Sequence, residues 1–374
     1  MHNTINDKMF LNSLLMLMSA TISTIVCVPI DDNAQLFQAI ANSVNTNNTE
    51  KFYEHRTEVC YQDLGCFYLE GPMKQTNMLP SSLEKINTQF FIYYRSGQVE
   101  EQIVDPYNSS TFKKINRSKQ LVIIVHGFNN DHKVGYLVRM KDAILKYLKS
   151  KIGAVIMVDW SGGSAIPFYR KASCNTQVVG RQITFLVDRL KHFIGLDPLS
   201  VHLIGFSLGA QASGFAGKHA RKVYGWTYGR ITGLDAAAPM FEGYEGSYLT
   251  FADARFVDAI HTSAGKHMLK GEVGFIGQYG HEDFYPNGGL DQPMCTGTAD
   301  IACNHKASVL YFAVSIEQPK KCPFSAYPCS DWVTYKNNTC LNPDARMGYY
   351  SIDGKGSGDH FLSMTTKSDK ICYT

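Results

Sequence analysis

The chain has 374 residues, of which 44% are hydrophobic and 18% are charged, and its formal net charge is +3. A chain of this length and composition can bury a full hydrophobic core, so a disordered or fibrous protein is excluded. Lys and Arg are mixed with acidic residues instead of forming a basic stripe, and we therefore expect no nucleic-acid partner.

The N-terminal segment contains an apolar stretch from about Met9 to Ile30 that is interrupted by Asn, Ser and Thr. A short, diluted apolar stretch is typical of a signal peptide, and no later segment has the roughly 18 to 20 unbroken apolar residues of a membrane helix. We predict a signal peptide over 1–28, a secreted, extracellular protein, and no transmembrane segment in the mature chain; an uncleaved anchor is the alternative. Residues 29–58 are rich in Asn and Gln without clear periodicity, which predicts a loose arm or propeptide.

Ten cysteines support export, because an oxidising compartment allows thiols to pair. One of the ten, Cys27, lies inside the predicted signal peptide, so the mature chain keeps an odd number and one thiol is left over. Glycosylation sequons fit the same compartment, although such tripeptides are weak signals. They begin at Asn47, Asn108, Asn116 and Asn337.

From Cys60 onward, short β-branched segments alternate with helix-length segments. The predicted strands cover 88–94, 121–127, 154–160, 200–207 and 229–235, and the predicted helices include 136–150 and 176–195. Strand and helix in alternation predict an α/β fold with a mostly parallel sheet in one domain over 59–374. The chemistry of such sheets lies at the carboxyl ends of the strands.

The segment LIGFSLGA, 203–210, contains the pattern Gly-x-Ser-x-Gly between a predicted strand and a small-residue helix. In a nucleophile elbow these glycines allow a strained turn that exposes the serine above the sheet, so Ser207 is the candidate nucleophile. The alternative is a simple turn of small residues. The backbone N–H of Leu208, and that of Phe128 at the end of an earlier strand, could bind the oxyanion.

A serine nucleophile needs a base that is oriented by a carboxylate, and in this fold the acid and then the histidine follow the serine. Asp235 ends the next apolar strand and is the leading acid, with a turn-capping role as its alternative. Spacing leaves the choice of histidine open among four candidates that follow Asp235. These are His261, His267, His281 and His305.

The chain resembles the animal pancreatic lipase superfamily from about Cys60 to Cys372. The matching segments are CYQDLGCF (60–67), VHGF (125–128), VDWSGGS (158–164), VHLIGFSLGA (201–210), RITGLDAAAPMF (230–241), FVDAIHT (256–262), GHEDFYPNGGLDQPMC (280–295) and CNHKAS (303–308). The resemblance implies an α/β-hydrolase fold. It also implies a triad of Ser207, Asp235 and His305, with Phe128 and Leu208 as oxyanion donors.

Two departures bear on the substrate. The cysteine pair before His305 encloses only 296–302, where pancreatic lipases carry a long amphipathic lid, and the family's C-terminal β-sandwich is not present before the chain stops. Both features resemble secreted phospholipases A1. We therefore expect an open crevice, hydrolysis of the sn-1 ester of phospholipids at a lipid surface, and little interfacial activation. The loop 263–279 resembles a full-length loop, which keeps an acylglycerol substrate and a triacylglycerol lipase as the alternative.

Some relatives are non-enzymatic binding or storage proteins that lack the triad serine, but this chain keeps all three triad positions. Asp253 lies where some members place a calcium ligand, whereas Thr250 replaces a neighbouring ligand, so we expect no metal and no cofactor. Family spacing implies four disulfides with Cys174 as the free thiol. The expected pairs are Cys60–Cys66, Cys295–Cys303, Cys329–Cys340 and Cys322–Cys372.

Overall fold

The computed structural model describes residues 32–45, 56–94, 101–353, 356–367 and 370–372, so the predicted signal peptide, 1–28, lies outside it. The main sheet of this part of the chain has eleven strands in the order β12-β11-β13-β10-β9-β8-β7-β5-β6-β3-β4. The strands are β3 (Gln89–Tyr93), β4 (Gln102–Ile103), β5 (Gln120–Val125), β6 (Ile152–Asp159), β7 (Val201–Phe206), β8 (Tyr228–Leu234), β9 (Ala254–Ile260), β10 (Glu282–Pro286), β11 (Ser325–Pro328), β12 (Ala345–Arg346) and β13 (Gly358–Leu362).

The centre of this sheet is parallel from β6 to β13, and the strands at both edges are antiparallel. The predicted mostly parallel α/β architecture is therefore confirmed. Two short antiparallel pairs lie outside the main sheet. They are β1 (Glu58–Tyr61) with β2 (Gly65–Tyr68), and β14 (Thr365–Lys367) with β15 (Lys370–Cys372).

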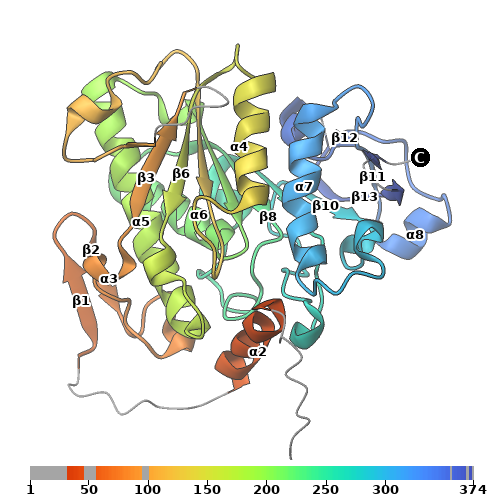
Figure 1. Ribbon diagram of the computed structural model, residues 1–374, viewed down its shortest axis with the longest axis horizontal. Coiled ribbons are helices and arrows are strands. Elements are labelled where there is room, and N and C mark those ends of the chain that lie inside the picture. The colour runs from red at the N-terminus through yellow and green to blue at the C-terminus, as the bar shows by residue number, and fades with distance from the viewer. Residues whose placement is uncertain (1–31, 46–55, 95–100, 354–355, 368–369, 373–374) are drawn as a thin grey trace, which may run out of the picture.

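Helices cover both faces of the sheet (Figure 1). They are α2 (Asp32–Asn45), α3 (Leu83–Ile86), α4 (Gly135–Tyr147), α5 (Tyr169–Ile194), α6 (Leu208–His219), α7 (Cys303–Glu317) and α8 (Trp332–Lys336). Alternate side chains of β5 point to opposite faces. Leu121 and Ile123 join the core under α5 and α6, whereas Val122 and Ile124 join the core under α4 and α7. The continuous apolar strands are thus explained by burial on both sides.

Three of the predicted disulfides are present: Cys60–Cys66, Cys295–Cys303 and Cys329–Cys340. Cys322 is also disulfide-bonded, and the side chain of its predicted partner, Cys372, lies outside the described residues. Cys174 is a buried free thiol, as predicted, and burial raises its pKa to about 11. This thiol is therefore protonated at neutral pH and donates to the carbonyl of Met78 at 3.0 Å.

The expectation of a loose arm over 29–58 is wrong for residues 32–45, which form helix α2. Apolar residues in this segment recur at helical spacing, and Phe37, Ile40 and Ala41 are buried against the rest of the molecule. Tertiary packing therefore stabilises a helix that its Asn and Gln content concealed. No helix in the described part of the chain combines the length and the apolar character needed to cross a membrane.

Candidate active site

Ser207 occupies the turn between β7 and α6, with φ 57° and ψ −122°. This backbone conformation is strained for a residue with a side chain and is typical of a nucleophile elbow. The turn is tightly enclosed: a Cβ added to Gly209 would lie 2.1 Å from the carbonyl oxygen of Val125. A larger residue at position 209 would push the elbow away from β5. The close approach of the two backbones therefore explains why the motif has a glycine at this position.

Asp235 follows β8 directly, and its side chain is fully buried. Its Oδ2 accepts a hydrogen bond from Nδ1 of His305, in the first turn of α7, at 2.6 Å. Its Oδ1 accepts from the backbone N–H groups of Thr262 at 2.7 Å and Ser263 at 3.0 Å. The hydroxyl of Ser263 donates to Oδ2 as well. Four donors therefore hold this carboxylate in one orientation.

The elbow and the Asp235–His305 pair meet at the carboxyl edge of the sheet. The backbone N–H of Ser207 donates to the carbonyl of Leu234, and the N–H of Ala237 donates to the carbonyl of Ser207, at 3.0 and 3.2 Å. The ring of Phe206 lies 4.6 Å from the ring of His305, centroid to centroid. Adjacent parallel strands end together, so residues far apart in sequence are neighbours here.

The candidate oxyanion donors flank the serine from two sides. Leu208 is the first residue of α6, where backbone N–H groups have no acceptor within the helix. Phe128 follows β5, and a Cβ on the preceding Gly127 would lie 3.3 Å from Ser207 Oγ. The 126–128 loop is fixed by Trp160, which donates its backbone N–H to His126 Nε2 at 3.0 Å and its indole N–H to the His126 carbonyl at 2.9 Å.

The arrangement has counterparts among known proteins. The family model described as Lipase matches residues 57–369. The chain is 37% identical to pancreatic lipase-related protein 2 of Cavia porcellus, covering 79% of this chain and 68% of that protein. It is 34% identical to pancreatic triacylglycerol lipase of Homo sapiens, covering 79% and 67% of the two chains. The chain belongs to the Lipase family.

It is therefore a carboxylic ester hydrolase with an α/β-hydrolase fold. A solved phospholipase/carboxylesterase from Dyadobacter fermentans is similar at 12% identity and a TM-score of 0.31, over 64% of this chain and 99% of that chain.

The other three candidate histidines of this lipase have surroundings that differ from those of His305. His261 is fully buried, with Nε2 bonded to Asp283 at 2.9 Å and Nδ1 to the carbonyl of Phe275 at 2.7 Å. Burial lowers its pKa, but the bonds and charge of its partners outweigh burial and raise the pKa above the usual value. His281 Nδ1 accepts from the backbone of Val257, and His267 is exposed. Of the four, His305 alone is bonded to Asp235.

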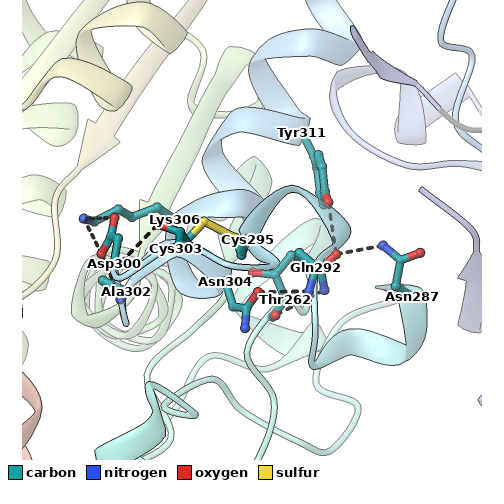
Figure 2. Close-up of a disulfide and its surroundings, with 11 residues drawn as sticks. Thr262, Asn287, Gln292, Cys295, Asp300, Ala302, Cys303, Asn304, Lys306 and Tyr311 are labelled. Atoms are coloured by element: carbon teal, nitrogen blue, oxygen red, sulfur yellow. Dashed lines mark hydrogen bonds and ion pairs between the residues drawn. A yellow bond between two sulfur atoms is a disulfide. The ribbon is translucent and has the colours of Figure 1, made fainter. Parts of the chain in front are cut away.

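The 296–302 loop of this lipase is tied down at its end and leads into α7 (Figure 2). The Cys295–Cys303 disulfide closes the loop, and Asp300 accepts from the backbone of Ala302 at 3.0 Å and pairs with Lys306 at 3.0 Å. These contacts fix the first turn of α7 and therefore the position of His305.

Gln292 connects the same region to the loop that holds Asp235. Its backbone N–H donates to Asn304 at 2.9 Å, and its side-chain amide donates to the carbonyl of Thr262 at 3.2 Å. Tyr311 donates to the other side of that amide at 3.1 Å. One buried side chain therefore couples α7 to the 262–263 backbone. Sequence reasoning identified neither Gln292 nor Ser263, because nothing in the local pattern distinguishes them from ordinary loop residues.

Asp253, the candidate calcium ligand, is paired with an ammonium group. Lys218 Nζ lies 2.5 Å from Asp253 Oδ2 and 2.6 Å from the carbonyl of Tyr248. The backbone N–H of Thr250 donates to the same carboxylate oxygen at 2.8 Å. In the described residues, the charge of this buried acid is thus balanced from within the chain.

Proposed function

We propose that this lipase is a secreted phospholipase A1 that hydrolyses the sn-1 acyl ester of phospholipids at a lipid surface. The observation that carries the substrate class is the short loop 296–302, which is closed by a disulfide and has Ile301 as its only large apolar side chain. Seven residues span at most about 25 Å when fully extended, and the bridge folds them back. Such a loop is too short to form the long helical lid that covers the site in pancreatic lipases.

The proposed reaction uses Ser207 as the nucleophile. His305 takes the Ser207 proton while Oγ forms a bond to the acyl carbon, and the N–H groups of Phe128 and Leu208 bind the developing oxyanion. His305 then donates the proton to the leaving glycerol oxygen, and an acyl-enzyme remains. Water, deprotonated by His305, attacks the acyl carbon and releases the fatty acid.

Asp235 is the proposed orienting acid of this triad. Its bond to Nδ1 at 2.6 Å keeps the proton on that nitrogen, which leaves Nε2 as the basic atom toward Ser207, and its charge stabilises the imidazolium that forms. No step in this scheme needs a metal or a cofactor. The three disulfides of the described residues support the secreted location.

A triacylglycerol lipase is the second candidate. Pancreatic triacylglycerol lipases are among the relatives, and the loop 263–279 resembles the full-length loop of the family, which supports an acylglycerol substrate. The test is product analysis on phosphatidylcholine carrying different labels in its two acyl chains, with triolein run in parallel. Release of the sn-1 label above triolein turnover supports phospholipase A1, whereas dominant triolein turnover would select the second candidate.

A further inference from the structure

Helix α2 lies at the end of the molecule where the carboxyl edge of the sheet and the start of α7 are found (Figure 1). It packs against the N-terminal part of the chain's longest helix, α5, and against η7, the short 3-10 helix Met268–Lys270 of the 263–279 loop. Helix α2 therefore bridges α5 and the 263–279 loop.

The buried face of α2 is apolar and its outer face is polar. Phe37 and Ile40 are 1% and 4% exposed and belong to the same core cluster as Phe128, Leu208 and Ala237. The exposed positions are Gln35, Gln38 and Asn42. An amphipathic helix is thus seated with its apolar face toward the side of the molecule that carries the proposed oxyanion donors.

Arg170 holds the last turn of α2. Its Nε and one terminal nitrogen donate to the carbonyl of Ser43 at 3.0 and 2.7 Å. The preceding residue, Tyr169, contacts the ring of Phe128 edge-on at 5.1 Å and donates its hydroxyl to the carbonyl of Pro239 at 3.1 Å. The attachment point of α2 is therefore one residue away from a side chain that touches the proposed oxyanion loop.

Two cavities are lined in part by α2. The first, of about 540 Å³, is lined by Val44 of α2 together with Ala238, Met240 and Met268. The second, of about 650 Å³, is lined by Ala39 and Ser43 of α2, with Phe168 and Tyr169 opposite. Both cavities have mixed polar and apolar linings, and the first reaches Ala238, one residue beyond the backbone bonded to Ser207.

We propose that α2 occupies the acyl-chain groove of this lipase and that lipid enters only after α2 leaves it. Ser207 is 7% exposed and His305 is 6% exposed, which agrees with a covered site. An isolated helix of this length is marginal in water, but a lipid surface offers its apolar face a new partner. The proposal rests on Ser207 being the nucleophile. The sequence alone predicts little interfacial activation. The proposal predicts the opposite, because α2 would cover the site in water as a lid does.

The test measures how fast Ser207 of the full chain reacts with a long-chain alkyl fluorophosphonate in the absence of lipid. The double variant Phe37→Asp, Ile40→Asp places two charges on the docked face, whereas Gln35→Asp, Gln38→Asp adds the same charges on the exposed face. We expect the first variant to react about ten-fold faster, because reactivity follows the fraction of open molecules. The control variant and the wild type should react equally. Equal rates in all three proteins would overturn the proposal.

A milder variant covers the case in which the double variant does not fold. Arg170→Gln removes the bonds to Ser43 without placing a charge in the core, and we expect about a three-fold faster reaction with an unchanged near-ultraviolet circular dichroism spectrum. Phosphatidylcholine micelles should accelerate labelling of the wild type more than that of this variant. A folded Arg170→Gln protein with wild-type reactivity would contradict the proposal. Absence of label at Ser207 in every protein would instead contradict the proposed function.

Discussion

Two of the buried histidine–aspartate pairs at the carboxyl edge of the sheet use histidines that follow Asp235, and His132 and Asp159 form another such pair at the end of β6. His305 bonds to Asp235 at 2.6 Å, and His261 bonds to Asp283 at 2.9 Å. Both carboxylates also accept backbone N–H groups, Asp283 from Tyr279 at 3.1 Å and from Gly280 at 2.8 Å. By distance and by burial the pairs are alike, so a short contact between histidine and aspartate does not by itself identify a catalytic base.

The pairs differ in the second ring nitrogen. His261 uses Nδ1 for the carbonyl of Phe275, and its ring stacks on that of Tyr285 at 4.3 Å. Among the described residues, Nε2 of His305 has no hydrogen-bond partner. A base needs one nitrogen free to receive a proton. The unoccupied Nε2 of His305 therefore fits the proposed role of base, whereas both ring nitrogens of His261 are already bonded, which fits a structural role.

The largest effect on activity is expected from removing the proposed nucleophile or the proposed base. Ser207→Ala and His305→Ala should each lower kcat/KM for ester hydrolysis by a factor on the order of 10⁴ to 10⁶, because the triad acts as a unit. Circular dichroism should remain that of the wild type. The check is hydrolysis of a short-chain phosphatidylcholine together with phosphonate labelling. Label appearing at another serine in the Ser207→Ala protein would contradict the assignment.

Removing His261 from the His261–Asp283 pair should lower stability and leave activity largely intact. His261→Ala leaves Asp283 buried without its partner and should lower the free energy of unfolding by about 3 kcal/mol, with kcat within about ten-fold of the wild type. Urea unfolding and steady-state kinetics on the same preparation measure both effects. His281→Ala is the control for removing a histidine from this region. Loss of activity in His261→Ala together with activity kept in His305→Ala would reverse the two roles.

Ser263 offers a further test of the proposed catalytic pair, Asp235 and His305. Its hydroxyl donates to Asp235 and lies 3.4 Å from His305 Nδ1, so we interpret it as a positioning residue. Ser263→Ala removes one of the four donors, and kcat should fall about ten-fold with KM little changed. The acidic limb of the kcat pH profile should shift as well. Ser263→Thr, which keeps the hydroxyl, should restore most of the activity; if it behaves like the alanine variant, the role is packing.

The raised pKa of His261 predicts a pH dependence of stability. The folded state binds the proton more tightly than the unfolded state does, so this stabilisation is complete below the ordinary pKa and is lost as pH rises through the raised value. The free energy of unfolding of the wild type should therefore decline above about pH 6.5. His261→Gln should show a flatter profile in this range. Equal slopes for the two proteins would show that His261 does not titrate with unfolding.

Glu282 should also make the free energy of unfolding decline as pH rises, by a smaller amount than His261. Burial raises the pKa of this carboxyl to about 7, although a hydrogen bond from Ser351 opposes the shift. The protonated form is favoured in the folded state, so stability should be lost as pH rises from the ordinary value toward 7. Glu282→Gln removes the charge and should flatten unfolding measurements between about pH 5 and 7. An unchanged slope would exclude this carboxyl as the titrating group.

Local patterns in the sequence were enough for the alternating strands and helices and for the Ser207 turn. Each of these depends on residues near one another in sequence, where periodicity, backbone sterics and short loops decide the outcome. The α/β class and the candidate nucleophile could therefore be predicted from the residues themselves, and the disulfides from family spacing.

The arrangement around the proposed base depends on contacts between distant segments. Asp235 and His305 are 70 residues apart in the sequence. They are in contact because the end of β8 and the start of α7 lie at the same edge of the sheet. The second histidine–aspartate pair, the Ser263 hydroxyl and the Gln292 link follow from the same three-dimensional packing and have no local signature. Helix α2 is the clearest case, because its composition predicts a loose arm and its burial against α5 and η7 makes it a helix.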